Sequence, residues 1–444
     1  MERRIARNID DLIQIWKSDV KFEIDDFDEE GTPTSYYADR YSFDKIDIDF
    51  ELNFPLLNDI NNDMESFLHQ NISILSFKNC KFLKDVYLGR MKSDIEFTEN
   101  CKFEAEFKSR GSLGNITFIE SEISNINFED GNFGSEEEKN DKKGKVRFRN
   151  CNLFQTNFRN TTFNSIVDFW SSTFHNPVTF YKTDFIEVVV FSAVNFKENV
   201  LFTYTLIEKL MILRGTNPEK GFDLSLAIIS GRLTVFNFHF DDFKSYGKIY
   251  KYINEALREQ NISYQRAYED IYEKAVSQKH LIPIENKRET YRILKNQLES
   301  QKNFIDSIPF RVMENKTLLK ESFKKLWHGH KISRSISNII VLSLNAISNR
   351  FGSSYITGII FTLSVATLFF NLALSHIGDY VFTANIGDWE WRYFVQFINP
   401  THRFDYMKLV DVNPRQWFFI WDFLGRIFIG YGIYQTIQAF RKYR

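Results

Sequence analysis

Residues 146–207 read VRFRNCNLFQTNFRNTTFNSIVDFWSSTFHNPVTFYKTDFIEVVVFSAVNFKENVLFTYTLI. Large apolar residues recur along this stretch at steps of five, or of five alternating with six. They are Phe148, Leu153, Phe158, Phe163, Phe169, Phe174, Phe180, Phe185, Phe191, Phe196, Phe202 and Ile207. Such steps would scatter the series over separate faces of an α-helix, and on a strand a step of five moves the side chain to the other face. A coil that turns a corner about every five residues places every member inside, so the spacing predicts a quadrilateral β-helix.

A second series of small or β-branched residues stands two positions before the large ones. It comprises Val146, Cys151, Thr156, Thr161, Val167, Ser172, Val178, Thr183, Val189, Val194, Val200 and Thr205. Both series should point inward with an eleven-residue period, two units forming one turn. The register can be followed back to Leu75 and Phe77, and the charged stretch 134–145 must loop out of it. At a rise of about 4.8 Å per turn, about six turns would make a rod roughly 30 Å long.

Several runs in this register carry a resemblance to a known family. NCKF, VDFWSSTF, VTFYKTDF and VVFSAVNF resemble pentapeptide-repeat proteins, in the eleven-residue variant of bacterial membrane proteins. The resemblance covers residues 71–240. NRFGSSYITGIIFT, FINPTHRF and LGRIFIGYGIYQTIQAFRKYR look like the two-helix, ion-channel-like membrane module attached to such repeats. The resemblance implies a right-handed, four-sided β-helix and no shared enzymatic activity.

The sequence divides into four regions on this interpretation. Residues 1–70 form an acidic segment that would cap the open end of the coil, with an acidic partner-binding arm as the alternative. Residues 71–243 form the repeat. Residues 244–333 form a basic linker of helices, expected at about 248–278, 285–303 and 308–327. Residues 334–444 form the membrane module.

Two apolar segments, 354–374 and 417–439, are long enough to cross a hydrocarbon core of about 30 Å as transmembrane helices. Residues 335–347 are apolar but shorter, which favours an interfacial helix. Basic residues precede the first segment and follow the second, so the positive-inside rule places both termini in the cytoplasm. The expected location is the inner membrane of a bacterium, with the lipid bilayer as a partner.

Polar side chains inside the second segment are the sharpest functional candidates. Asp422 and Arg426 lie one helical turn apart, and Gln435 and Gln438 follow. Because charge is costly in lipid, they either neutralise each other as a local pair or line a pore made by several copies of the helix.

Small residues recur on one face of each apolar segment. They are Ser354, Gly358, Thr362 and Ala366 in the first, and Gly425, Gly432 and Ala439 in the second. Small residues let helix backbones approach closely in lipid. They predict either pairing of the two segments within one chain or assembly of a homo-oligomer.

Composition narrows the function classes. The chain has 444 residues, 46 phenylalanines and a net charge of −2. Acidic and basic residues balance over 71–215, which disfavours nucleic-acid mimicry and nucleic-acid binding. The three cysteines, Cys80, Cys101 and Cys151, occupy the small slot of the repeat, which suits a reducing compartment. No motif indicates catalysis, a metal or a cofactor, so we do not expect an enzyme.

Two functions follow from this organisation. The first is a membrane effector whose helices form an oligomeric pore, with the cytoplasmic β-helix sensing or gating, in a bacterial defence role. The second is a membrane-tethered scaffold whose β-helix binds a protein partner without conducting ions.

Overall fold

The computed structural model describes residues 3–19, 23–27, 33–54, 72–91, 93–134, 144–238, 242–246, 279–329, 332–377, 385–387, 390–403 and 416–441, with single positions between 252 and 276. The chain forms two compact units, Met1–Ile293 and Leu294–Arg444.

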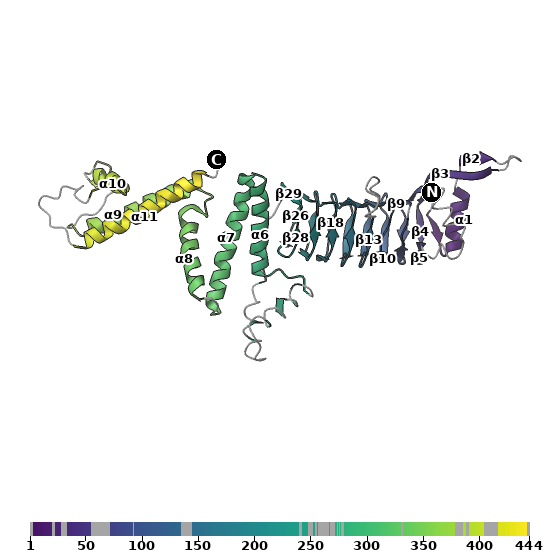
Figure 1. Cartoon of the computed structure of the whole chain (residues 1–444), viewed down its shortest axis with the longest axis horizontal. Coiled ribbons are helices and arrows are strands. Elements are labelled where there is room, and N and C mark those ends of the chain that lie inside the picture. The colour runs from purple at the N-terminus through teal and green to yellow at the C-terminus, as the bar shows by residue number, and fades with distance from the viewer. Residues whose placement is uncertain are drawn as a thin grey trace. The chain divides into compact units, whose positions relative to one another are not determined.

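The first unit is a β-solenoid of about seven turns, whose strands lie side by side along it (Figure 1). Sheet 1 contains β1 (Arg4–Ala6), β4 (Ile46–Ile48), β7 (Lys81–Phe82), β10 (Lys102–Ser109), β12 (Glu122–Asn127), β15 (Asn152–Asn157), β18 (Thr173–Phe174), β22 (Asn195–Phe196) and β26 (Asn217–Pro218), with β5 (Leu52–Asn53) and β8 (Val86–Leu88) beside them. Sheet 2 contains β2 (Glu23–Phe27), β3 (Pro33–Asp44), β6 (Ile72–Lys78), β9 (Asp94–Thr98), β11 (Ile116–Ile119), β14 (Val146–Arg149), β17 (Val167–Asp168), β21 (Val188–Val190), β25 (Leu210–Arg214) and β29 (Arg232–Phe236).

Two shorter sheets complete the wall. Sheet 3 contains β13 (Asn132–Phe133), β16 (Thr162–Phe163), β20 (Asp184–Phe185), β24 (Leu206–Ile207) and β28 (Ile228–Ile229). Sheet 4 contains β19 (Val178–Tyr181), β23 (Asn199–Thr203) and β27 (Gly221–Asp223). The described pairs are parallel except β2 with β3, which is antiparallel.

From β16 onward the paired strands keep a steady register. Asn195 pairs with Asn217, 22 residues later, so two eleven-residue units make one turn, as the sequence predicts. The pairing of Ile116 with Val146 passes over the charged insertion. A Cβ added to Gly144 would lie 2.3 Å from Cα of Gly134, so the insertion leaves and rejoins the wall at one point. Residues 135–143 lie outside the described residues.

Left-handed corner residues mark every half-turn. They are Asn150, Asn160, Ser171, Lys182, Ala193, Tyr204 and Gly215, with φ between 50° and 65°. Each stands immediately before a small residue of the repeat. Asn and Gly adopt this conformation readily, whereas other residues pay about 1–2 kcal/mol for it. The stacked wall must therefore hold the Ser, Lys, Ala and Tyr corners in place.

Stacked phenylalanines fill the interior. The ten predicted core residues from Phe148 to Phe202 are buried. Copies one turn apart stack with ring centroids 4.9–5.5 Å from each other, as Phe158 does on Phe180 and Phe180 on Phe202. Burying each side chain contributes about 1.5–3 kcal/mol, so the aromatic column is the main source of stability.

Hydroxyl groups in the small slot tie successive turns together. Each donates to the backbone carbonyl of a core phenylalanine in the preceding turn, at 2.5–2.8 Å. The donor–acceptor pairs are Thr161–Phe128, Ser172–Phe148, Thr183–Phe158, Thr205–Phe180 and Thr216–Phe191. The three cysteines share this slot as free, buried thiols. Burial raises the pKa of the Cys151 thiol to about 12, so it stays protonated.

The solenoid includes strands before residue 71, where the sequence analysis placed a separate capping segment. β3 pairs with β6 and β4 with β7, in parallel as in the later turns. Helix α1 (Ile9–Asp19) follows β1. Residues 43–50 alternate like a strand that could lead into the first turn, but the apolar spacing of the rest of this region is too irregular to predict its strands.

Polar side chains dock the start of α6 (Ile284–Ser300) on the last turns of the solenoid. Asn286 donates to Asp223 at 2.8 Å, and Thr290 accepts from the backbone nitrogen of Leu224 at 2.9 Å. Lys287, though buried, pairs with Asp242 and lies over the ring of Phe243. This part of α6 therefore covers the apolar end of the coil. The helix expected at 248–278 falls almost wholly outside the described residues.

The second unit is helical. It comprises the rest of α6, α7 (Phe304–Trp327), α8 (Ile332–Asn349), α9 (Tyr355–Leu374), α10 (Glu390–Ile398) and α11 (Gln416–Phe440). α9 and α11 lie side by side along their lengths, with α8 and α10 against them. The side chain of Ser354 caps α9 by accepting from the backbone nitrogen of Thr357.

Among the described helices, α9 alone is long and apolar enough to cross a membrane by length and composition. The second expected span, 417–439, is the helix α11, but its composition does not reach that level. Asp422, Arg426 and two glutamines lower its hydropathy.

Candidate functional site

Asp422 is fully buried within the helical unit, where its carboxyl group contacts two basic side chains. Arg426 donates from Nε to Oδ2 at 2.8 Å, one turn along α11, as the spacing predicts for a local pair. His402, which follows α10, lies with Nε2 2.8 Å from Oδ1. The sequence analysis did not identify His402, because its contact with Asp422 spans 20 residues and no local pattern encodes it.

Both ring nitrogens of His402 have a polar partner. Nδ1 lies 2.7 Å from the backbone oxygen of Asn399, and Nε2 lies 2.8 Å from the carboxyl group of Asp422. This buried trio, the Asp422 cluster, ties α11 to the segment after α10.

A second buried polar cluster joins α8 to α11. Gln435 is buried, and Asn349 donates to its side-chain oxygen and, at 3.2 Å, to its backbone oxygen. Nε2 of Gln435 donates to Asn345 at 3.2 Å, and the hydroxyl of Tyr431 donates to the same oxygen at 2.9 Å. Gln438, by contrast, is exposed.

The small residues pack α9 on α11 within one chain. A Cβ on Gly358 would lie 2.6 Å from Oγ1 of Thr436, and one on Gly432 would lie 2.4 Å from Oγ1 of Thr362. A Cβ on Gly425 would meet the ring of Phe397 in α10 at 2.5 Å. Ala366 and Ala439 are buried. These contacts pair α9 with α11 within the chain.

The outward faces of these helices are apolar. Exposed large apolar side chains on α8 are Ile332, Ile336, Ile340, Val341 and Ile347; on α9 they are Ile356, Ile359, Ile360, Leu363 and Leu368; on α11 they are Trp417, Phe419, Ile420, Phe423, Ile427, Tyr434, Ile437 and Phe440. The helical unit thus encloses ionisable and amide side chains beside an apolar core that includes Phe370, Phe397 and Ile429, and it also exposes hydrocarbon, which is unusual for a surface in water.

A polar cleft of about 440 Å³ opens in the wall of the solenoid. It forms where β15 loses its partner. Gln155, Thr156 and Asn157 pair with β12 on one side, whereas the pairing of β15 with β18 on the other side ends at Leu153. The next strand at this level, β19, belongs to sheet 4. The cleft lies at this step, lined by Gln155, Thr156, Asn157, Arg159, Asn176, Pro177, Thr179, Tyr181, Thr203 and His280.

His280 closes the cleft from outside the repeat. Its Nδ1 lies 2.8 Å from Oγ1 of Thr179, and its backbone oxygen accepts from Asn199 at 2.8 Å. Burial lowers the pKa of His280 below its ordinary value, so the ring is neutral near pH 7. The sequence analysis assigned no function to the cleft, and it placed Thr156 in the core.

Comparison with protein-family models gave no match, and comparisons with curated proteins and with solved structures gave none either. Within the described residues, no group of three or more His, Cys, Asp or Glu side chains could hold a metal ion.

Proposed function

We propose that this chain is a membrane-anchored scaffold. In this proposal α9 and α11 cross the inner membrane of a bacterium as a helical pair, and α8 lies at the interface. The solenoid and both termini lie in the cytoplasm, where the solenoid wall binds a protein partner. The four sheets and the 22-residue turn support a four-sided coil, right-handed by resemblance to pentapeptide-repeat proteins.

One observation carries the proposal: the helical unit exposes apolar side chains and encloses polar ones that bond to one another. Leu363 of α9 and Phe423 of α11 are exposed, while Asp422 and Gln435 of α11 are buried. Exposed hydrocarbon on adjacent helices is costly in water and favourable in lipid. Buried ionisable groups that pair with one another are the form in which lipid tolerates them.

The same contacts favour a scaffold over a pore. A pore lined by Asp422 and Gln435 would need these side chains on an outer face, available to other copies of α11. Asp422 is fully buried with His402 and Arg426, and Gln435 bonds to α8. Exposing the carboxylate would break two charge-assisted hydrogen bonds.

Fractionation tests the anchor. The wild-type chain should stay with membranes through an alkaline carbonate wash and leave only in detergent. The double variant Ile360→Arg/Leu363→Arg should shift to the soluble or aggregated fraction, because each charge costs about 2.5–3.5 kcal/mol in the bilayer centre. Ile228→Arg, an exposed position on the solenoid, is the matched control and should leave the membrane fraction unchanged. Wild-type protein in the soluble fraction without detergent would contradict the anchor.

Ion flux separates the scaffold from the pore. Purified chain in liposomes should give no flux above that of protein-free liposomes. Flux that disappears in Asp422→Asn, together with a multimeric native mass in detergent, would replace the scaffold with an oligomeric pore.

A further inference from the structure

We propose that the cleft at the β15–β19 step binds a small phosphate ester, with Arg159 as the anion anchor and Thr156 and His280 as further donors. The inference concerns the solenoid alone, so it holds whether or not the helical unit spans a membrane.

The first observation is an orphan hydroxyl. Threonines at the equivalent slot elsewhere, such as Thr161 and Thr183, donate to a phenylalanine carbonyl of the preceding turn. Oγ1 of Thr156 is buried at the cleft and has no hydrogen-bond partner within the described residues. A buried donor without a partner costs about 1–3 kcal/mol, which a ligand oxygen would recover.

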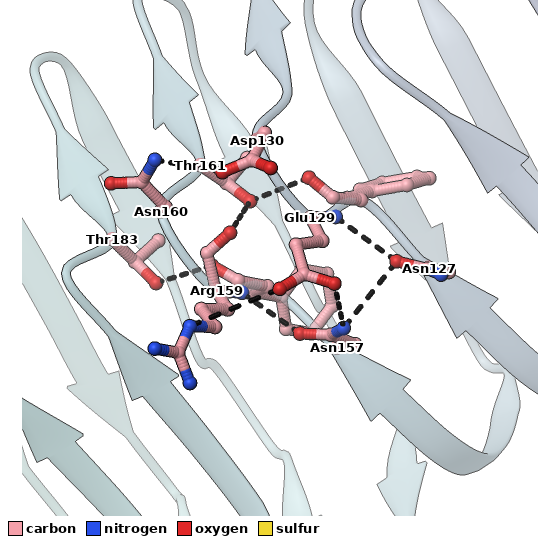
Figure 2. Close-up of polar contacts among 10 residues, drawn as sticks. Asn127, Glu129, Asp130, Asn157, Arg159, Asn160, Thr161 and Thr183 are labelled. Atoms are coloured by element: carbon pink, nitrogen blue, oxygen red, sulfur yellow. Dashed lines mark hydrogen bonds and ion pairs between the residues drawn. The ribbon is translucent and has the colours of Figure 1, made fainter.

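The second observation is a positioned guanidinium. Arg159 lies over the ring of Tyr181, 4.7 Å from its centroid, and its Nε is 3.8 Å from Glu129. Figure 2 shows how the polar ladder around it is built: Asn157 donates to Glu129 and accepts from the backbone nitrogen of Arg159. Within the described part of the chain, Nη1 and Nη2 of Arg159 make no hydrogen bond. They form the planar fork that binds phosphate oxygens in pairs.

The third observation is the charge of the lining. Among the described residues of the lining, Arg159 is the one with a formal charge, and none carries a carboxylate. Glu129 faces Nε, outside the lining, and so offsets only part of the positive charge. The remaining polar lining is amides, hydroxyls, Tyr181 and the neutral ring of His280. When the hydroxyl of Thr179 donates to Nδ1, Nε2 of His280 carries the proton and can donate to a ligand.

The size of the cleft sets the size of the ligand. A volume of about 440 Å³ lies within the range of about 300–1,000 Å³ typical of small-molecule sites. It exceeds what a bare phosphate needs, and the amides of Gln155 and Asn176 suit the hydroxyls or ring nitrogens of an attached sugar or base. The ligand class is therefore a phosphate ester of a polar, ring-bearing molecule.

Calorimetric titration of the full chain in detergent tests the inference. The probes are 5′-AMP and glucose 6-phosphate, each compared with its parent, adenosine or glucose. At least one ester should bind saturably, about tenfold or more tighter than its parent. The two esters distinguish a nucleotide from a sugar phosphate as the source of the phosphate.

Variants locate the binding. Arg159→Gln should weaken the ester about tenfold or more, and Thr156→Val about threefold. Arg214→Gln is the matched control, because Arg214 also lies over an aromatic ring, that of Phe236, away from the cleft; it should bind as the wild type does. If Arg159→Gln does not fold, Arg159→Lys keeps the charge but loses the fork and should still weaken binding. The inference is overturned if neither ester binds up to about 10 mM, if the parents bind equally well, or if the folded Arg159 variants bind unchanged.

Discussion

The solenoid and the α9–α11 pair both bury apolar side chains, but they differ in the side chains that they expose. The solenoid stacks phenylalanines inside, and its charged pairs, such as Lys197 with Glu219, lie on its surface. The helical pair buries Asp422 and Gln435 and exposes leucine, isoleucine and phenylalanine. The apolar core of the first unit is therefore stabilised by its removal from water. The apolar surface of the second unit favours contact with hydrocarbon.

The largest effect should come from breaking the aromatic column. Phe180 stacks between Phe158 at 5.2 Å and Phe202 at 4.9 Å. Phe180→Ala should lower the free energy of unfolding by about 3–5 kcal/mol, because a cavity opens between two rings. Denaturant titration followed by the β-sheet circular dichroism signal would measure it. Trp170→Ala, at an exposed aromatic, should cost less than about 1 kcal/mol; equal losses in the two variants would contradict a stacked core.

Breaking the Asp422 cluster should come next. Asp422→Ala leaves Arg426 and His402 without the buried carboxyl group that each contacts and should cost about 3 kcal/mol. Thermal unfolding in detergent would report the loss. Replacing all three residues with leucine or methionine should recover most of it, since buried apolar packing substitutes well for an ion pair. No loss in Asp422→Ala would mean that the carboxylate is not buried as described.

A matched pair of threonines gives a smaller and sharper comparison. Thr183→Val removes a hydrogen bond to the carbonyl of Phe158 and should cost about 1 kcal/mol. Thr156→Val makes the same change in the same slot of the repeat, but its hydroxyl has no partner, so stability should stay equal or rise. Denaturation midpoints measured side by side would check the sign. Equal destabilisation of the two variants would show that the hydroxyl of Thr156, like that of Thr183, makes a stabilising hydrogen bond.

The smallest expected effect is a pH dependence from His280. Its pKa is lowered in the folded state, so folding favours the neutral ring. The contribution is fully present above the unfolded pKa of about 6.5 and is lost as the pH falls below that value. The unfolding temperature of the wild type should therefore fall from pH 7 to pH 5 more than that of His280→Gln. Parallel pH profiles would mean that His280 does not titrate in contact with Thr179.

The repeat was predictable because it is periodic. The phenylalanines from Phe148 to Phe202 recur at steps of five or six residues, a spacing that fits the turns of a four-sided coil but neither an α-helix nor a single strand. Residues 43–50 alternate like a strand and were expected to lead into the first turn, but the rest of the segment before residue 71 lacks the repeat spacing, so its strands were not predicted. The left-handed corners were also missed, although Asn150 and Asn160 carry a recognisable signal for them.

The candidate sites were predictable only where contacts are local. The pair Asp422–Arg426 followed from helical spacing, whereas His402 and Asn349 reach their partners from distant parts of the chain. Thr156 was assigned to the core because it keeps the period. Thr156 lines the cleft because the pairing of β15 with β18 ends at Leu153, before it reaches this position.

The steady register of the later turns has a consequence for how this gene can change. Asn195 and Asn217 occupy equivalent places one turn apart, as do Val167 and Val189. Excising one complete 22-residue unit would rejoin matching positions and preserve each rung above and below, whereas losing ten or twelve residues would set every later ring against the wrong neighbour. Duplication or loss of whole 22-residue units can therefore change the length of the solenoid by one turn at a time, while the residues at its two ends stay the same.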